Sequence, residues 1–262
     1  MCLVLGFVGR SGAVPANVKP QAETFGHSVQ GRPLVAYVLG NGSDVTAVFG
    51  AFHGDERQTP GVVRRLMRYL EDHPDEVQNR TVILVPVANP DGLHAGTRVN
   101  AHGVDLNRNF PVDWHPQGSS VRYSPGATPE SEPETQAIAA LMKRYQPAKV
   151  ISIHQPLNRL IYSGPFGKSL AAVMQTRDGL PITDHSVRPT PGSFGQYCGD
   201  GLKSSIVTVE LGRHVSAAQA NMQKDALMAA IRVPLSSLAA AAGVTPARRI
   251  TAGKYMHRRQ RP

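Results

Sequence analysis

Two histidines and two glutamates of this chain have the residue types and spacing that zinc chemistry requires. His53 and Glu56 lie three residues apart, His154 comes much later, and Glu210 closes an apolar run near the end of the chain. Two neutral imidazoles and a carboxylate can bind Zn²⁺ and leave the fourth coordination position for water. Such a site is suited to hydrolysis.

The two histidines and Glu210 each follow a strand-like segment. These segments are 45–52, 149–153 and 205–209. If they are neighbours in one largely parallel sheet, all three side chains lie at its carboxyl edge, where open α/β sheets bind their ligands. A histidine and a glutamate three residues apart also occur often by chance, and the alternative is a surface histidine beside a capping glutamate.

A second group of polar residues lies in the segment 89–133, where regular periodicity disappears. Asn89-Pro90-Asp91-Gly92 indicates by itself only a turn. Asn107-Arg108-Asn109 is more informative, because an arginine can bind a carboxylate through two parallel hydrogen bonds with amide donors beside it. The alternative is a loop whose asparagines satisfy nearby backbone groups. A connection of this length in a compact domain is usually functional or disordered.

Taken together and in this order, these residues resemble the zinc carboxypeptidases of the carboxypeptidase A type. The resemblance is carried by His53-x-x-Glu56, NPDG at 89–92, Arg98, GVDLNRNF at 103–110, His154 after Ile-Ser-Ile, and Glu210 after a late strand. It covers roughly residues 25–235. Within the family the likeness is strongest to the bacterial murein peptide amidases, which share the compact length and the segments 98–111, 131–137 and 190–195.

The resemblance implies one Zn²⁺ per chain and a catalytic role for two further residues. The metal ligands would be His53, Glu56 and His154. Glu210 would act as general base and acid, and Arg98 would polarise the scissile carbonyl. The same likeness implies a three-layer α/β sandwich, with helices on both faces of a mixed, mostly parallel sheet.

The resemblance also implies how a substrate binds. Asn107 and Arg108 would hold the carboxylate of a terminal residue, and the substrate would be a small peptide such as a murein tripeptide, cut between γ-D-glutamate and diaminopimelate during cell-wall recycling. Two positions depart from the family. A digestive carboxypeptidase has a mobile tyrosine at the position that corresponds to the region of Val187, and this chain has none there. Tyr197 lies nearby in the sequence but is not equivalent by spacing. Gln155 follows the second zinc-binding histidine where the murein enzymes have an aspartate.

Three other functions are compatible with parts of this pattern. An ordinary metallocarboxypeptidase or a deacylase of N-acyl amino acids could use the same metal site and arginine. A non-enzymatic binder of polyanions or peptidoglycan could use the net charge of +9, much of which lies in the basic tail. No nucleic-acid motif with interleaved aromatic residues accompanies that charge, so no specific nucleic-acid partner is expected.

Periodicity predicts one domain. The boundaries are a poorly ordered leader at 1–24, a catalytic domain at 25–243 and a basic tail at 244–262. Strands are expected at 34–39 and 45–52, forming a hairpin, and at 81–87. Helices are expected from Thr59, from Glu132, over 167–177 and over 216–242 with a break near Pro234.

The compartment is predicted from weaker signals. Cys2 and Cys198 do not make a disulfide framework and are compatible with a reducing compartment, with Cys198 read as a small buried hydrophobic residue. We therefore expect a cytoplasmic protein, or a periplasmic or secreted one if 1–8 is a truncated leader. No apolar run is long enough to span a membrane. The oligomeric state is left open.

Overall fold

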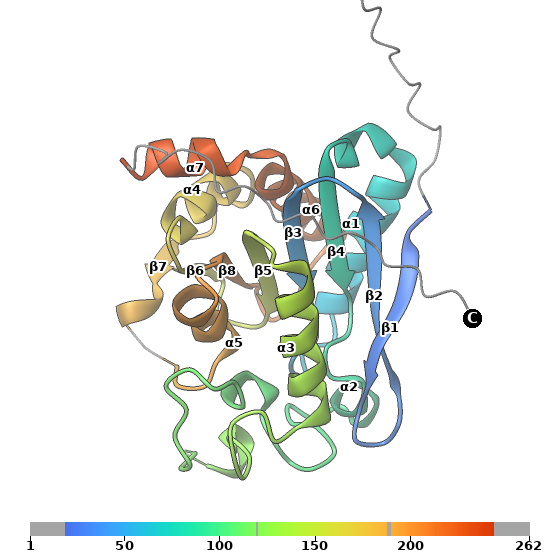
Figure 1. Cartoon of the computed structure of the whole chain (residues 1–262), viewed down its shortest axis with the longest axis vertical. Coiled ribbons are helices and arrows are strands. Elements are labelled where there is room, and N and C mark those ends of the chain that lie inside the picture. Colours follow the sequence, from blue (N-terminus) through green and yellow to red (C-terminus); the bar gives the residue numbers. More distant parts are fainter. Residues whose placement is uncertain (1–18, 119, 188–189, 244–262) are drawn as a thin grey trace, which may run out of the picture.

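The computed structural model describes residues 19–118, 120–187 and 190–243, and it is built on one mixed sheet (Figure 1). Eight strands of the described chain form this sheet in the order β1-β2-β4-β3-β5-β8-β6-β7. Their bounds are β1 Gln21–His27, β2 Pro33–Gly40, β3 Asp44–Phe49, β4 Arg80–Val85, β5 Lys149–His154, β6 Arg159–Ser163, β7 Ile182–Asp184 and β8 Ser205–Glu210.

The centre of the sheet is parallel, as the expected convergence of His53, His154 and Glu210 requires. β4, β3, β5 and β8 are consecutive parallel strands, whereas β1, β2 and β6 pair antiparallel with their inner neighbours. His154 and Glu210 are the last residues of β5 and β8 and lie opposite each other in the register. The expected adjacency of the three strands is thus confirmed, and their carboxyl ends meet at one edge.

Helices cover both faces of the sheet. One face carries α1 (Thr59–Asp72), α4 (Gly167–Asp178), α6 (Ala217–Arg232) and α7 (Leu235–Ala241), and the other carries α3 (Pro133–Tyr145) and α5 (Phe194–Gln196) (Figure 1). A further helix, α2 (Pro90–Ala95), lies in the long connection after β4. These layers confirm the predicted three-layer α/β sandwich.

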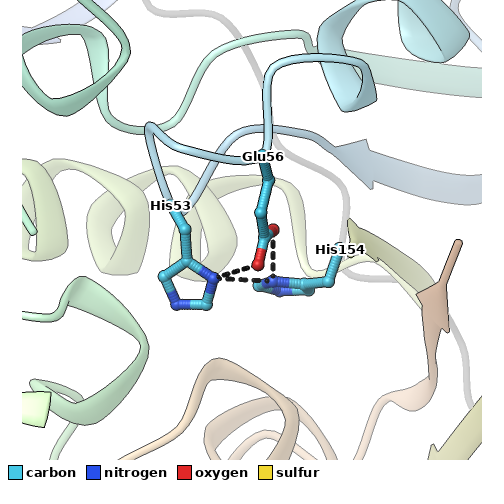
Figure 2. A group of neighbouring side chains, drawn as sticks. All are labelled: His53, Glu56 and His154. Carbon is cyan, nitrogen blue, oxygen red and sulfur yellow. Dashed lines mark hydrogen bonds and ion pairs between the residues drawn. The ribbon is translucent and has the colours of Figure 1, made fainter. Parts of the chain in front are cut away.

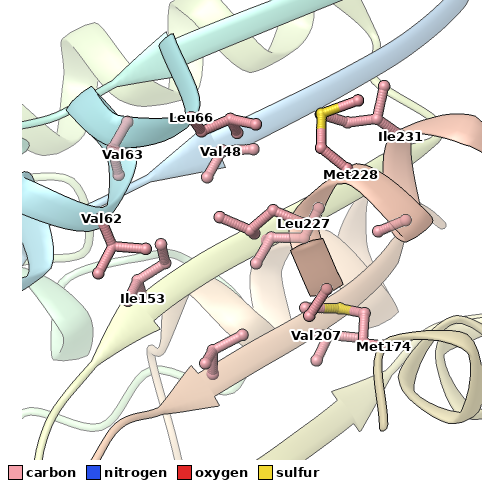
Figure 3. Close-up of a cluster of buried hydrophobic side chains, with 14 of the residues drawn as sticks. Val48, Val62, Val63, Leu66, Ile153, Met174, Val207, Leu227, Met228 and Ile231 are labelled. Carbon is pink, nitrogen blue, oxygen red and sulfur yellow. The ribbon is translucent and has the colours of Figure 1, made fainter. Parts of the chain in front are cut away.

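Alternation along the central strands explains why two hydrophobic cores form. Val48 and Val207 belong to the core under α1, α4 and α6 (Figure 3), and so does Ile151. Their strand neighbours Phe49 and Val150 face the core under α3. Successive side chains of a strand point to opposite faces, so a continuous apolar run is what a strand covered on both sides needs. The β-branched runs of the sequence therefore form the middle of the sheet.

The expected hairpin of 34–39 with 45–52 is wrong. β4 lies between β2 and β3, and β2 pairs antiparallel with β1 and β4. The physical reason is that β3 is buried on both faces and takes a parallel neighbour on each side. β3 also ends at Phe49, because the chain leaves the sheet through Gly50 and Ala51, whose φ is 48°.

The predicted boundaries also shift. β1 begins at Gln21, so residues 21–24 lie in the sheet and not in the expected leader. Residues 1–18 and 244–262 lie outside the described residues. The connection 89–133 contains α2 and two short 3₁₀ turns, η2 (Leu106–Arg108) and η3 (Val121–Tyr123). The segment 190–201 contains α5 and a π turn, η5 (Tyr197–Gly201). Among the described residues, no helix is long and apolar enough to cross a membrane.

Candidate metal centre and substrate cleft

The side chains of His53, Glu56 and His154 converge on one point (Figure 2). Nδ1 of His53 lies 2.6 Å from one carboxylate oxygen of Glu56, and Nδ1 of His154 lies 3.0 Å from the other. The two Nδ1 atoms are 3.2 Å apart. All three residues are buried, and one ligand atom from each lies within 4.8 Å of the other two.

A tight turn after β3 brings His53 and Glu56 together. The backbone N–H of Glu56 donates to the carbonyl of His53 at 3.2 Å, which places the two side chains on the same side of the turn. Gly54 makes this turn possible, because a Cβ at this position would lie 1.8 Å from the backbone carbon of Gly92. The turn thus packs directly against the start of α2. The helix itself begins with the side chain of Asn89 accepting from the N–H of Gly92 at 2.9 Å.

Two further groups fix the orientation of the imidazoles. Oδ1 of Asp105 lies 3.1 Å from Nε2 of His53, and Oγ of Ser152 lies 3.0 Å from Nε2 of His154. A metal-bound histidine commonly donates its other ring N–H to such an acceptor. The sequence did not identify either group. For Asp105 the signal was available, since it belongs to the run GVDLNRNF, and the adjacent Asp55 instead pairs with Arg122 at 2.7 Å.

The donor set of the three residues fits a zinc ion. With a proton on each Nε2, both Nδ1 lone pairs and the Glu56 carboxylate are directed at the same point, and three acceptors in that arrangement need a cation. Charge supports this: burial alone would lower the pKa of His53, but the carboxylates of Asp105 and Glu56 raise it to about 9. A proton on His53 thus takes the place that a metal's positive charge would fill.

The carboxylates respond to the same electrostatics. Burial tends to raise the pKa of Glu56, but His154 and His53 lower it to about 2. Burial likewise opposes ionisation of Asp105, yet His53 and Arg98 hold its pKa well below the usual range. Both groups are therefore ionised at neutral pH.

Glu210 faces this centre from the neighbouring strand and has a different environment. Burial raises the pKa of its carboxyl group, with the charge of Glu56 adding to the shift, while His154 opposes it. Its one hydrogen bond among the described residues is a long one, 3.4 Å from the backbone N–H of Leu157. A carboxylate with a raised pKa and few partners takes up a proton more readily than an ordinary one, as a group that shuttles protons must.

Arg98 reaches the metal centre from the connection after α2. Its Nη2 lies 2.9 Å from Oδ2 of Asp105, and its Nη1 lies 3.2 Å from Nδ1 of His53. Its guanidinium also lies over the ring of Tyr123, with 4.9 Å between Cζ and the ring centroid. These three contacts hold a cation at the edge of the candidate site.

Arg108 and Asn107 lie beside it on η2. Nη1 of Arg108 donates to the carbonyl of Asn107 at 2.7 Å, and its Cζ is 5.5 Å from the Tyr123 ring centroid. Oδ1 of Asn107 accepts from the backbone N–H of Phe194 at 2.8 Å, and its Nδ2 has no acceptor among the described residues. Tyr123, which sequence reasoning missed, therefore contacts both Arg98 and Arg108.

Two further asparagines of the family-like segments stabilise the connection 89–133 through hydrogen bonds. Nδ2 of Asn109 donates to the carbonyls of Pro125 and Thr128, and Nδ2 of Asn100 donates to the carboxylates of Glu132 and Glu134. Asn109 thus has the role considered as the alternative for the loop asparagines, since it satisfies backbone carbonyls. The segments near 100, 109 and 132 are thus distant in sequence but form one network.

All predicted site residues except His154 line one open cleft of about 620 Å³, and His154 is buried against its wall. Gln155 lies at the rim, where its amide donates to the carbonyl of Gly212 at 2.9 Å. Tyr197 is buried and stacks on Phe110, outside the cleft lining. Cys198 is fully buried, which confirms its reading as a small hydrophobic residue.

Comparison with known proteins agrees with this geometry. A model of the zinc carboxypeptidase family matches residues 17–220. The chain belongs to the zinc carboxypeptidase family. It is therefore a hydrolase, and the family implies zinc at the buried triad.

Several members of this family are similar to the chain over most of its length. Murein peptide amidase A of Escherichia coli K12 is 35% identical over 204 residues, covering 73% of this chain and 81% of that protein. The crystal structure of the murein-tripeptide amidase of E. coli O157 has a TM-score of 0.68 at 31% identity, covering 85% of this chain and 94% of that one. Carboxypeptidase A of Helicoverpa armigera, at 21% identity and a TM-score of 0.72, covers 87% of this chain and 70% of its own and shows the shared fold.

We expect Asp105→Asn to weaken zinc binding by about ten- to hundredfold, because the neutral amide no longer fixes the orientation of His53 or raises its basicity as a ligand. Competition with a zinc-binding dye measures the affinity, and circular dichroism checks the fold. Asp55→Asn is the matched control, since Asp55 pairs with Arg122 and not with a histidine. Equal affinities in both variants and the wild type would contradict the role of Asp105.

We expect Tyr123→Leu to lower kcat/KM by about tenfold and Tyr123→Phe to leave it nearly unchanged, because contacts between a cation and an aromatic face contribute on the order of 0.5–2 kcal/mol each. Tyr145→Leu is the control, because Tyr145 holds Arg144 at a similar 4.9 Å outside the cleft. Steady-state kinetics distinguishes the variants. A loss in Tyr123→Phe equal to that in Tyr123→Leu would show that the ring face is not what matters.

Proposed function

We propose that this chain is a zinc-dependent peptidase that hydrolyses the amide bond preceding a terminal residue with a free carboxylate. We further propose that its substrate is a murein peptide, cut between γ-D-glutamate and diaminopimelate. The observation that carries the proposal is the convergence of His53, Glu56 and His154 opposite Glu210, in a cleft that also holds Arg98 and Arg108. The murein substrate is supported by the similarity to murein peptide amidase A.

One zinc ion per chain would be held by Nδ1 of His53, Nδ1 of His154 and the carboxylate of Glu56. When bound, the metal supplies a Lewis acid for the scissile carbonyl. The protein's own part is to direct both Nδ1 lone pairs at the ion, and the acceptors beside the Nε2 atoms contribute by holding the ring proton on Nε2. Asp105 has the stronger effect of the two acceptors, because it is charged and fully buried.

Glu210 would move the proton in this reaction. As a carboxylate it accepts a proton from the attacking water, and as an acid it delivers that proton to the leaving amine. Its raised pKa favours the second step, because a weaker acid keeps the proton on Glu210 until the leaving amine accepts it. The few partners of its oxygens leave them accessible from the cleft.

Arg98 would donate to the oxygen that becomes negative when water adds to the carbonyl. Donors fixed before the reaction stabilise such charge without reorganising, and loss of one typically costs a hundred- to thousandfold in rate. Asp105 and Tyr123 hold the guanidinium in advance. Arg108 and the free amide of Asn107 would bind the terminal carboxylate, which fixes which bond reaches Glu210.

The proposal includes a cytoplasmic location, in keeping with a reducing compartment for a chain without a disulfide framework. It is tested with purified protein and a substrate panel that contains L-Ala-γ-D-Glu-diaminopimelate, an α-linked peptide with a free terminus and an N-acyl amino acid. Mass spectrometry identifies the products. Release of diaminopimelate in preference to the other products is expected, and cleavage of the acyl amino acid alone would identify a deacylase.

We expect Glu210→Gln to retain about one zinc per chain while its turnover falls by about a hundred- to ten-thousandfold, because the amide cannot accept the proton from water. Metal analysis and kinetics are measured on the same preparation. Turnover near the wild-type value would remove Glu210 from its role. Loss of the metal together with turnover would show that Glu210 supports the metal site instead.

We expect Arg108→Ala to raise KM by about ten- to hundredfold for a substrate with a free terminal carboxylate, since a hydrogen bond to a charged group contributes about 1.5–3 kcal/mol. The same substrate amidated at that carboxylate should be affected little. Arg108→Lys should be intermediate, because it keeps the charge but not the planar pair of donors. Equal losses on the free and amidated substrates would argue against binding of the carboxylate by Arg108.

A further inference from the structure

A second cavity, of about 260 Å³, lies where α4 ends and α6 begins. The segments 155–159 and 210–215 border both this cavity and the substrate cleft, but of the described residues none lines both. Gly212 lines the cavity, and its carbonyl accepts from Nε2 of Gln155 in the cleft at 2.9 Å. The cavity is therefore a neighbour of the cleft and not an extension of it.

This cavity has an exposed rim and a buried floor. The exposed lining residues are Asn158, Pro181, Gln219 and Met222, and the buried ones are Asp178, Leu211 and Gln223. Sites for small molecules combine a largely apolar lining with a few polar groups that orient the ligand. Since one water occupies about 30 Å³ in the liquid, the cavity has room for a ligand of several non-hydrogen atoms.

Asp178 is the one ionisable side chain of the described lining, and it has no cationic partner. Its oxygens accept from the backbone N–H of Leu180 at 3.0 Å and from Nε2 of Gln223 at 3.4 Å, whereas no described lysine, arginine or histidine lies within 4.0 Å. Burial raises the pKa of this carboxyl group, and the two donors oppose the shift. Asp178 is also the last residue of α4, at the negative end of the helix dipole. Positive charge is therefore favoured at this place.

Gln223 adds an acceptor that the protein leaves unused. Its side chain is buried, with 5% of the residue exposed, and its Nε2 donates to Asp178. Its Oε1 has no donor among the described residues, and a buried acceptor without a donor is unfavourable. Because one amide group joins this oxygen to the contact with Asp178, both acceptors lie at one place in the floor of the cavity.

We propose that this cavity binds a small aliphatic amine in its ammonium form. An ammonium group brings a positive charge and three donors, which match the carboxylate of Asp178 and the free oxygen of Gln223. The alkyl chain would lie along Leu211, Val215 and Met222 toward the rim. The inference is independent of the proposed function, because none of these residues lines the substrate cleft.

The test uses n-butylammonium as the probe and 1-butanol as its neutral counterpart of the same chain length. Each is titrated into the zinc-loaded protein by calorimetry at neutral pH and constant ionic strength. The wild type should bind n-butylammonium at least about tenfold more tightly than 1-butanol, because hydrogen bonds between charged groups are the stronger ones. Equal binding of the two, or no binding of n-butylammonium, would overturn the proposal. Equally tight binding of inorganic ammonium would overturn the role of the alkyl chain.

Asp178→Asn should weaken binding of n-butylammonium by about ten- to hundredfold. The asparagine can still accept from Leu180, and its amide can donate to Oε1 of Gln223, so the variant should unfold at a temperature no lower than the wild type. Asp225→Asn is the matched control, because Asp225 also belongs to α6 but is exposed and pairs with Lys224 at 2.7 Å. Unchanged affinity in Asp178→Asn, or an equal loss in the control, would place the amine elsewhere and overturn the proposal.

Gln223→Met tests the second acceptor, because methionine keeps the length of the side chain but removes the amide. Binding of n-butylammonium should weaken by about three- to tenfold, a smaller loss than in Asp178→Asn because a neutral acceptor contributes less than a charged one. Unchanged affinity in this variant would overturn the role of Gln223. A crystal structure of the zinc-loaded protein with n-butylammonium should show the nitrogen beside Asp178, and density for the probe only in the substrate cleft would overturn the site.

Discussion

Two buried carboxylates at one end of the sheet set the charge balance on which the candidate site depends. Glu56 and Asp105 flank His53 on its two ring nitrogens, and Asp105 is fully buried. A buried charge without compensation is strongly unfavourable, so this part of the fold needs positive charge in a defined place. Arg98 supplies part of it through Asp105. The rest must come from protons on the imidazoles or from a metal ion, and the raised pKa of His53 shows how strong that demand is.

The same constraint couples metal binding to substrate binding. Asp105 accepts from His53, from Arg98 and from the backbone N–H of Asn107 at 2.9 Å. One carboxylate thus orients a candidate ligand, the candidate oxyanion donor and the start of the turn that carries Arg108. Because these contacts share one acceptor, a movement of the loop would alter the candidate metal centre and the wall that carries Arg108 together.

The metal-binding part of the site was predictable from sequence because it depends on regular structure. Continuous apolar runs identify strands buried on both faces, and parallel strands bring their carboxyl ends to one edge, so His53, His154 and Glu210 could be placed near one another before any coordinates were known. Asp105 and Tyr123 could not be placed in this way. Both lie in the connection after β4, where no periodicity reports which way a side chain points. The position of β2 was missed for a related reason: a short turn suggested a hairpin, whereas burial of β3 on both faces required parallel neighbours.

Several residues of the family-like motifs have a structural role. Gly54 and Gly92 allow two backbones to touch, Asn89 caps α2, and Asn109 holds the loop through three acceptors. A sequence motif does not separate these structural residues from those that act on a substrate, because the fold or the chemistry restricts the residue type at both kinds of position. Only the contacts separate them: a side chain whose donors and acceptors are satisfied by the protein has little left for a substrate. By this criterion Asn107, with its oxygen bound and its nitrogen free, belongs between the two classes.

The two walls of the cleft are built differently, and this bears on how specificity can change within one fold. On one side Arg98, Arg108 and Tyr123 come from the long connection and hold each other through hydrogen bonds and ring contacts. On the other side Arg159 and Ile161 come from β6, whose backbone is fixed by its pairing with β8 and β7. A substitution on the strand changes one side chain without moving the chain around it, whereas a substitution in the loop disturbs several mutually dependent groups. The wall built from β6 is therefore the part of the cleft that can change one residue at a time.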